Sequence, residues 1–220
     1  MSSPPPDQDT KTTLLLTAAQ LFAERGYAGA SVREIVRRAG ATLSAVNYHF
    51  ESKERLYAEA VRYVTEGSIR IHELGREIET KEFATPQEAS DTIALFFRRL
   101  LLAMLGPDQP EWAAKLHYRA LADEHDGATQ LFDEVFGPIL ELITSALHRA
   151  APNSSKEECQ LAVLAISGMA HHLSAARTGI CHVLGIEGYD KPFLIRTSDL
   201  LIDALLVQLG LPEPNIEGLT

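Results

Sequence analysis

Apolar residues recur at helical spacing along most of the chain, and no segment shows the period-two alternation of a half-buried strand. The first apolar stripe lies within residues 10–25, and Gly26 marks the end of that helix. Its members are Leu14, Leu15, Ala18, Leu21 and Phe22. Glycine and proline divide the remaining sequence into further helices. The pattern predicts an all-α protein.

A second, short helix is predicted over residues 31–39. Ser31 and Glu34 have the spacing of a capping box, in which the serine hydroxyl accepts from the third helical amide while the glutamate reaches back. Gly40 follows as the residue that ends the helix. The sequence therefore predicts where this helix begins and where it ends.

A third helix is predicted to begin near Thr42, which is a good N-cap, and to end by His49–Phe50. Only residues 40–43 separate it from the second helix. Two short helices joined by about four residues that include glycine are typical of a helix-turn-helix. In such a unit the second helix enters the major groove of DNA and places its first side chains at base edges.

Longer helices are predicted after this module. A fourth is expected to start after Ser52 and to run unbroken over residues 53–78, joining the two parts of the chain. The others are expected near residues 87–105, 111–125, 128–150, 156–184 and 193–210. Because the helix over 156–184 is apolar on nearly every side, it should be buried between two partners.

Charge is unevenly distributed over the 220 residues, whose net charge is −10. Residues 10–62 contain eight Lys or Arg and five Glu, whereas residues 63–220 contain 12 basic and 23 acidic residues. A short basic module next to an acidic remainder is compatible with nucleic-acid binding, despite the negative total.

Residues 11–65 resemble the N-terminal domain of the TetR family of bacterial regulators. The resemblance rests on the F-x-x-x-G-Y end of the first helix, the serine-capped second helix, the glycine turn, Y-H-F and S-K-E-x-L. The VNYHF form and the later layout, with Pro138 in a long helix, are most similar to the CecR-like branch. The family implies a homodimeric transcription regulator that binds double-stranded DNA, is usually a repressor, and responds to a small-molecule effector.

The resemblance, with the physical character of the side chains, implies a set of DNA contacts. Asn47 and Arg33 are expected to read bases, because Asn pairs well with adenine and Arg with guanine. Tyr48, His49 and Lys53 match positions that usually contact phosphates. The full set of expected DNA-contacting residues is Arg33, Thr42, Ser44, Ala45, Asn47, Tyr48, His49 and Lys53.

Structural roles compete with these functional ones. Phe50 is more simply a core residue, and Tyr48 could equally be core or a phosphate contact. Lys53 could belong to a solvated face, and Thr42 is first of all a helix cap. The sequence also departs from the family, because Asn47 stands where many members carry an aromatic residue.

The two C-terminal helices, 156–184 and 193–210, are expected to pair with those of a second copy as a four-helix dimer interface. Twofold symmetry would then place two reading helices about 34–36 Å apart on a near-palindromic operator. An effector site among the preceding helices is implied by the family. Its suggested lining residues, which could equally be ordinary core, are Phe96, Trp112, Tyr118, Phe136, Met169 and His172.

No cofactor and no enzymatic activity are expected, because no phosphate-binding loop, nucleophile elbow or paired-carboxylate site is visible. The histidines lack the spacing of a zinc site, so metal binding is a minor alternative. The expected organisation is a disordered tail over residues 1–10, a helix-turn-helix domain over 11–58 and a ligand-binding and dimerisation domain over 59–220. We expect a cytoplasmic protein; the main alternative function is a regulator that acts through a protein partner, with weak or lost operator binding.

Overall fold

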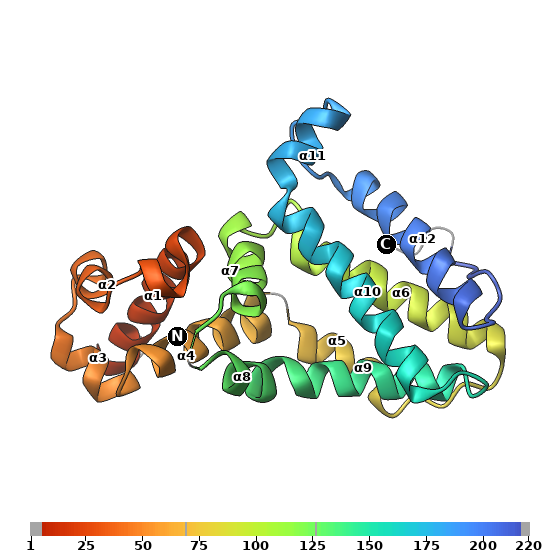
Figure 1. Cartoon of the computed structure of the whole chain (residues 1–220), viewed down its shortest axis with the longest axis horizontal. Helices are drawn as coiled ribbons and strands as arrows, with labels where there is room; N and C mark the ends of the chain where they lie inside the picture. The colour runs from red at the N-terminus through yellow and green to blue at the C-terminus, as the bar shows by residue number, and fades with distance from the viewer. Residues whose placement is uncertain (1–5, 69, 126, 217–220) are drawn as a thin grey trace. The chain divides into compact units, whose positions relative to one another are not determined.

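The computed structural model describes residues 6–68, 70–125 and 127–216, and within them it contains helices and no strand (Figure 1). The predicted all-α fold is confirmed. The chain forms two compact units, the first from Met1–Ser68 and Pro110–Asp133 and the second from Ile69–Gln109 and Glu134–Thr220.

The first unit is built around α1, which packs against α7, α4 and α2. All five members of the predicted apolar stripe, from Leu14 to Phe22, are buried. The helices of this unit are α1 (Pro6–Gly29), α2 (Val32–Ala39), α3 (Leu43–Phe50), α4 (Lys53–Tyr63), the π-helix η1 (Val64–Ser68), α7 (Glu111–Ala122) and α8 (Ala128–Leu131).

The start of α1 differs from the predicted tail over residues 1–10. Residues 1–5 lie outside the described part of the chain, whereas the helix already begins at Pro6. Proline at the start of a helix costs little, because the first turn needs no backbone donor there. The prediction therefore placed the beginning of the helix too late.

The second unit packs α6 against α12, α9 against α10, and α5 against α9. The buried side chain of Arg98 links α6 to the C-terminal part of this unit. It pairs with Asp199 of α12 at 2.7 Å and donates to the carbonyl of Ile216 at 3.3 Å. Its helices are α5 (Ile71–Glu79), α6 (Pro86–Leu105), α9 (Gly137–Ala150), α10 (Lys156–Ala175), α11 (Arg177–Leu184) and α12 (Lys191–Gln208).

The fourth helix is not continuous over residues 53–78 as predicted. After α4 the chain forms the π-helix η1, and α5 starts only after Arg70, which is left-handed with φ 55°. A non-glycine residue in this conformation cannot continue a right-handed helix. In η1 the buried hydroxyl of Thr65 lies 3.4 Å from Nδ1 of His117 on α7.

Two other predicted helices are also divided. The segment 128–150 consists of α8, the π-helix η2 (Phe132–Phe136) and α9, and the interruption precedes Pro138, which cannot donate to a carbonyl in the preceding turn. The segment 156–184 bends by 79° between α10 and α11. There the hydroxyl of Tyr189 donates to the carbonyl of Leu173 at 3.0 Å and so satisfies an acceptor in the last turn of α10.

Among the described residues, no single helix has both the length and the apolar composition of a membrane span, and only the bent pair α10–α11 reaches those values jointly. The predicted domain division at residue 58 stays a prediction. Within the first unit, α7 packs on α1 although it comes from the range assigned to the second predicted domain.

Candidate nucleic-acid interface

Local caps set the geometry of the α2–α3 pair. The Ser31 hydroxyl accepts from the amide of Glu34 at 3.2 Å at the start of α2. Gly40 ends α2 in the left-handed region, with φ 64°, where glycine is favoured. The Thr42 hydroxyl then accepts from the amide of Ala45 at 3.3 Å and starts α3. This is the short helix–turn–helix arrangement that the sequence predicted.

Helix α3 turns an apolar face inward and a polar face outward. Val46 and Phe50 are 1% and 3% exposed, so the core role of Phe50 is confirmed. Tyr48 is 75% exposed, and a core role for it is therefore wrong. Asn47 beside it is also exposed. The amide and phenol groups of α3 are thus available to an external partner.

The eight predicted DNA-contacting residues lie on α2, α3 and the adjoining cap and first turn. None of them is fully buried. Five are exposed, namely Arg33, Thr42, Ser44, Asn47 and Tyr48, and three are half-buried, namely Ala45, His49 and Lys53. Sequence reasoning missed Leu43, which is 46% exposed at the start of the same helix and offers an apolar contact of the kind that suits a thymine methyl group.

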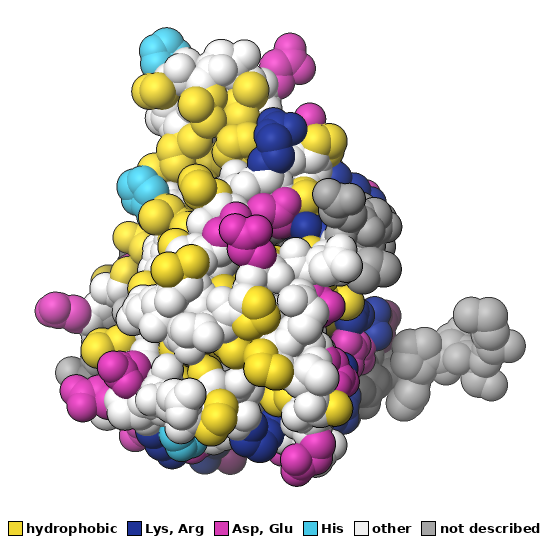
Figure 2. Space-filling view, turned by 90° about the vertical axis from the view of Figure 1, so that its right-hand side faces the viewer, with side chains coloured by type: hydrophobic (Ala, Val, Ile, Leu, Met, Phe, Trp, Pro, Cys, Tyr) yellow, Lys and Arg dark blue, Asp and Glu magenta, His cyan; other side chains and the backbone are white. Residues whose placement is uncertain are grey.

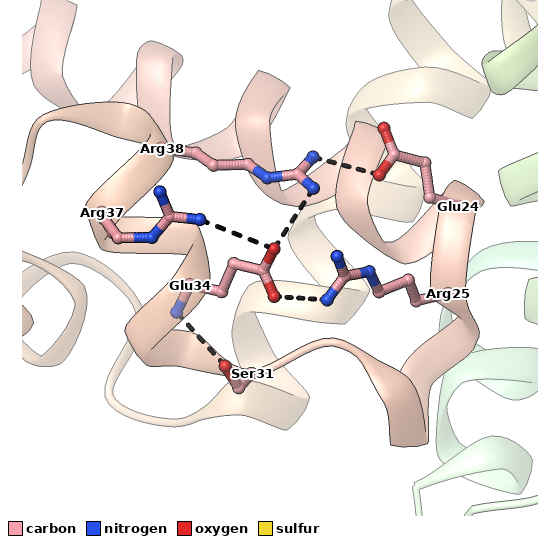
Figure 3. A network of polar contacts seen from close by, with 6 residues as sticks. All are labelled: Glu24, Arg25, Ser31, Glu34, Arg37 and Arg38. Atoms are coloured by element: carbon pink, nitrogen blue, oxygen red, sulfur yellow. Dashed lines mark hydrogen bonds and ion pairs between the residues drawn. The ribbon is translucent and has the colours of Figure 1, made fainter.

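An ion network joins α2 to the end of α1 (Figure 3). Glu34 pairs with Arg25 at 2.5 Å and with Arg38 at 3.2 Å, and Arg38 also pairs with Glu24 at 3.0 Å. The Glu34 carboxylate is therefore turned toward the arginines, and only the serine half of the predicted capping box forms. Exposed pairs of this kind add little stability each, but together they orient α2 on α1.

Arg33 stands apart from this network. It is exposed in the first turn of α2 and makes no ion pair with any described residue, whereas Arg37 and Arg38 on the same helix both pair with Glu34. A guanidinium without an internal carboxylate keeps its donors for a base or a phosphate. Arg33 is thus the α2 cation best able to contact DNA.

Lys53 begins α4 beside the aromatic ring of Tyr27. Its Nζ lies 4.3 Å from the ring centroid, and burial lowers the pKa of its ammonium. The Tyr27 hydroxyl donates to Oε1 of Glu54 at 2.6 Å. That hydrogen bond is the main reason why the pKa of Glu54 falls from 4.5 to about 2. Tyr27 was not among the predicted site residues, although it belongs to the F-x-x-x-G-Y element.

Replacing Tyr27 with Phe is expected to raise the pKa of Glu54 toward 4.5, because the donor is lost. In the wild type the folded-state pKa lies below the ordinary value. The ionised Glu54 therefore stabilises the folded protein fully above pH 4.5, and this contribution to stability is lost as the pH falls from 4.5 toward 2. NMR titration of the Glu54 carboxyl carbon in both proteins measures this change. Equal midpoints would contradict the assignment.

The residues predicted to line an effector site are distributed over both units. Phe96 and Phe136 are buried in the second unit. Met169 and His172 are exposed on α10, and Trp112 and Tyr118 are half-buried on α7. On α10 it is Ala170 and Leu173 that face the interior. Phe96 and Phe136 are therefore the two that could line a site inside the second unit.

The second unit leaves apolar side chains uncovered on its last three helices. Leu161 and Leu164 of α10 are 57% and 47% exposed, and Leu200 and Val207 of α12 are 73% and 74% exposed. No residue of α11 is buried. Figure 2 shows hydrophobic side chains gathered over the upper end of the view, where α11 projects. The described residues contain no group of three or more His, Cys, Asp or Glu side chains arranged to hold a metal ion.

Two family models match this chain. Residues 14–60 match the model for bacterial regulatory proteins of the tetR family, and residues 89–208 match the C-terminal domain of the HTH-type transcriptional dual regulator CecR. The first match contains α2 and α3, and the second contains most of α6 and all of α9, α10 and α12.

Individual relatives are similar over only part of this chain. The HTH-type transcriptional repressor KstR2 of Rhodococcus jostii is 42% identical over a 66-residue alignment, which covers 27% of this chain and 32% of KstR2. The HTH-type transcriptional regulator AcrR of Shigella flexneri is 36% identical over 52 residues, which are 24% of each chain. The chain thus aligns with about a third or less of the length of these relatives.

Solved structures extend the similarity of the fold to nearly the whole chain. The transcriptional regulator FadR from Bacillus subtilis, in complex with stearoyl-CoA, has a TM-score of 0.66 at 17% identity and covers 90% of this chain and 98% of its own. A transcriptional regulator from Aquifex aeolicus has a TM-score of 0.57 at 24% identity, with the same coverages.

Proposed function

The chain belongs to the TetR family of DNA-binding transcriptional regulators, as residues 11–65 predicted, and we propose that it is a ligand-responsive repressor that binds a near-palindromic operator as a homodimer. The observation that carries this proposal is the outward face of α3. Its exposed side chains Ser44, Asn47 and Tyr48 follow the Thr42 cap, and Arg33 lies exposed on the neighbouring helix. A helix so presented can enter a groove about 12 Å wide.

The exposed apolar residues of α10 and α12 support the homodimer. Leu161 and Leu164 are three residues apart on α10, and Leu200 and Val207 are seven residues apart on α12, so each pair lies on one helix face. Exposed apolar side chains that gather on one helix face are costly in water and are typical of an interface. A second copy would cover both faces through the same residues, since a twofold interface pairs a surface with itself.

The proposed regulation is a shift between two dimer forms. In one of these forms the reading helices are wrongly spaced for the operator. An effector that binds this form more tightly than the other would lower operator affinity, and the decrease is limited by the difference between its affinities for the two forms. Buried Phe96 and Phe136 are the proposed aromatic contacts for this effector in the second unit. A thermal-shift screen of small molecules, with stearoyl-CoA included because FadR holds it, would identify the chemical class.

DNA binding is tested by two substitutions with different expected signatures. With a duplex from the region upstream of its own gene, Asn47→Ala should weaken specific binding by about 1–3 kcal/mol and relax base preference. Lys53→Ala should instead weaken all sequences alike and reduce the salt slope by about one. Fluorescence anisotropy over a series of salt concentrations measures both effects.

Lys156→Ala is the matched control, because Lys156 pairs with Glu141 in the second unit at 2.5 Å. It removes one positive charge and should leave the salt slope unchanged. Unchanged operator binding by both Asn47→Ala and Lys53→Ala would show that α3 is not the reading helix. Weak, sequence-independent binding by the wild type would favour a regulator that acts through a protein partner.

A further inference from the structure

We infer that Tyr27 is a positioning residue for DNA binding, which holds the ammonium of Lys53 at the phosphate-contacting edge of the reading unit and ties it to the end of α7. The inference rests on the proposed function, in which Lys53 contacts a phosphate. It assigns to an aromatic residue of α1 a role in DNA binding that does not require contact with DNA.

Tyr27 constrains the first turn of α4 at two points. Its ring carries the Lys53 ammonium 4.3 Å from the centroid, a distance typical of a cation–π contact. Its hydroxyl donates to Glu54, the next residue, at 2.6 Å. Because the two contacts involve consecutive residues, movement of the ring changes the position of the lysine with it. Lys53 is half-buried, so part of its water shell is already replaced by the ring.

Tyr27 is in turn held by the residues at and after the end of α7. Its amide donates to Oδ2 of Asp123 at 3.1 Å, and its ring stacks on His125 with centroids 4.4 Å apart and an angle of 26°. Arg119 of α7 donates to the carbonyl of Ala23 at 3.0 Å, just before the kink of α1 at Gly26. The position of Tyr27 is thus determined from α7 as well as from its own helix.

Gly26 permits this close approach. It has φ 72°, and a Cβ built there would lie 2.7 Å from Oδ2 of Asp123 and 2.8 Å from Nη1 of Arg119. Any other residue would push these side chains away. The contact from Asp123 to Tyr27 therefore depends on the glycine that precedes the tyrosine.

A positioned lysine binds phosphate better than a mobile one, since less side-chain freedom is lost when the contact forms. Removing the ring should therefore weaken DNA binding by about two- to fivefold, the range of an exposed cation–π contact. The loss should appear only when Lys53 is present. A merely structural role of Tyr27 would weaken binding whether or not residue 53 is a lysine.

The test is a double-mutant cycle on the 220-residue chain with a 30-base-pair duplex of arbitrary sequence at low salt. The variants are Tyr27→Leu, Lys53→Ala and the double substitution, and the readout is the dissociation constant. We expect Tyr27→Leu to raise the dissociation constant two- to fivefold when Lys53 is present and to leave it unchanged in the Lys53→Ala background. Tyr27→Phe, which keeps the ring but loses the hydrogen bond to Glu54, should lose less affinity than Tyr27→Leu. Tyr63→Leu, which changes a tyrosine 36% exposed at the end of α4, is the control.

Equal losses in both backgrounds, or a loss in Tyr27→Phe as large as in Tyr27→Leu, would overturn the inference. If Tyr27→Leu does not fold, the wild type and Tyr27→Phe still decide by NMR. Ring currents should shift the ε-methylene protons of Lys53 upfield in both proteins, and ordinary lysine shifts would refute the contact. A wild type that binds no duplex would instead refute the proposed function.

Discussion

Replacing Phe22 with Ala is expected to lower the free energy of unfolding of the first unit by about 3–5 kcal/mol. Phe22 is fully buried on α1, and its ring meets that of Tyr57 of α4 edge-on, with centroids 4.8 Å apart. Truncation removes this contact and leaves a cavity among α1, α4 and their neighbours. Since domains are commonly stable by about 5–15 kcal/mol, the loss is a large share of the total. Urea unfolding measures it.

Tyr48→Ala is the matched control, because it also removes an aromatic ring from the first unit. Tyr48 is 75% exposed, so its truncation should change stability by no more than about 0.5 kcal/mol. The two variants thus separate the residues that build the core of the first unit from those that are proposed to contact DNA. A loss of less than about 1 kcal/mol in Phe22→Ala would mean that α1 does not organise this core.

The beginnings of helices in the first unit could be predicted because each depends on residues close in sequence. Ser31, Thr42 and Ser52 each accept a hydrogen bond from the amide three residues later. Such caps need no tertiary partner, so a short window of sequence identifies them. The helix-turn-helix was predictable for the same reason.

Two of the interruptions of the long helices could not be predicted, because the contacts found there join residues that lie far apart in the sequence. Thr65 in η1 is next to His117, 52 residues later. The end of α10 is completed by the hydroxyl of Tyr189, 16 residues after Leu173. Apolar periodicity continues through both interruptions and gives no sign of them.

The features of the candidate site likewise fall into those that the sequence predicts and those that only the structure shows. The core position of Phe50 could be predicted from the sequence, whereas Tyr48 was open to a core role until the structure showed it 75% exposed. The contact of Tyr27 with Lys53 joins α1 to α4, and the identity of the two residues alone does not predict it. Met169 on α10 is 40% exposed, and helical spacing alone cannot distinguish a face that meets the interior from one that is left uncovered.

Leu164→Glu is expected to dissociate the proposed dimer. Leu164 is 47% exposed on α10, next to the more exposed Leu161. At a twofold interface one substitution introduces two carboxylates, and burying them without partners costs several kcal/mol. We therefore expect the dissociation constant of the dimer to rise at least about a hundredfold, which sedimentation velocity over a range of concentrations would measure.

Operator binding should fall with the dimer, because two linked reading helices gain roughly 10²- to 10⁴-fold over one. Leu121→Glu is the control, since Leu121 is a similarly exposed leucine, at 37%, but lies on α7 in the first unit. It should remain dimeric and keep its operator affinity. Binding to an arbitrary duplex at low salt should survive in Leu164→Glu, because its reading unit is unchanged. A Leu164→Glu protein that stays dimeric at nanomolar concentration would place the interface elsewhere.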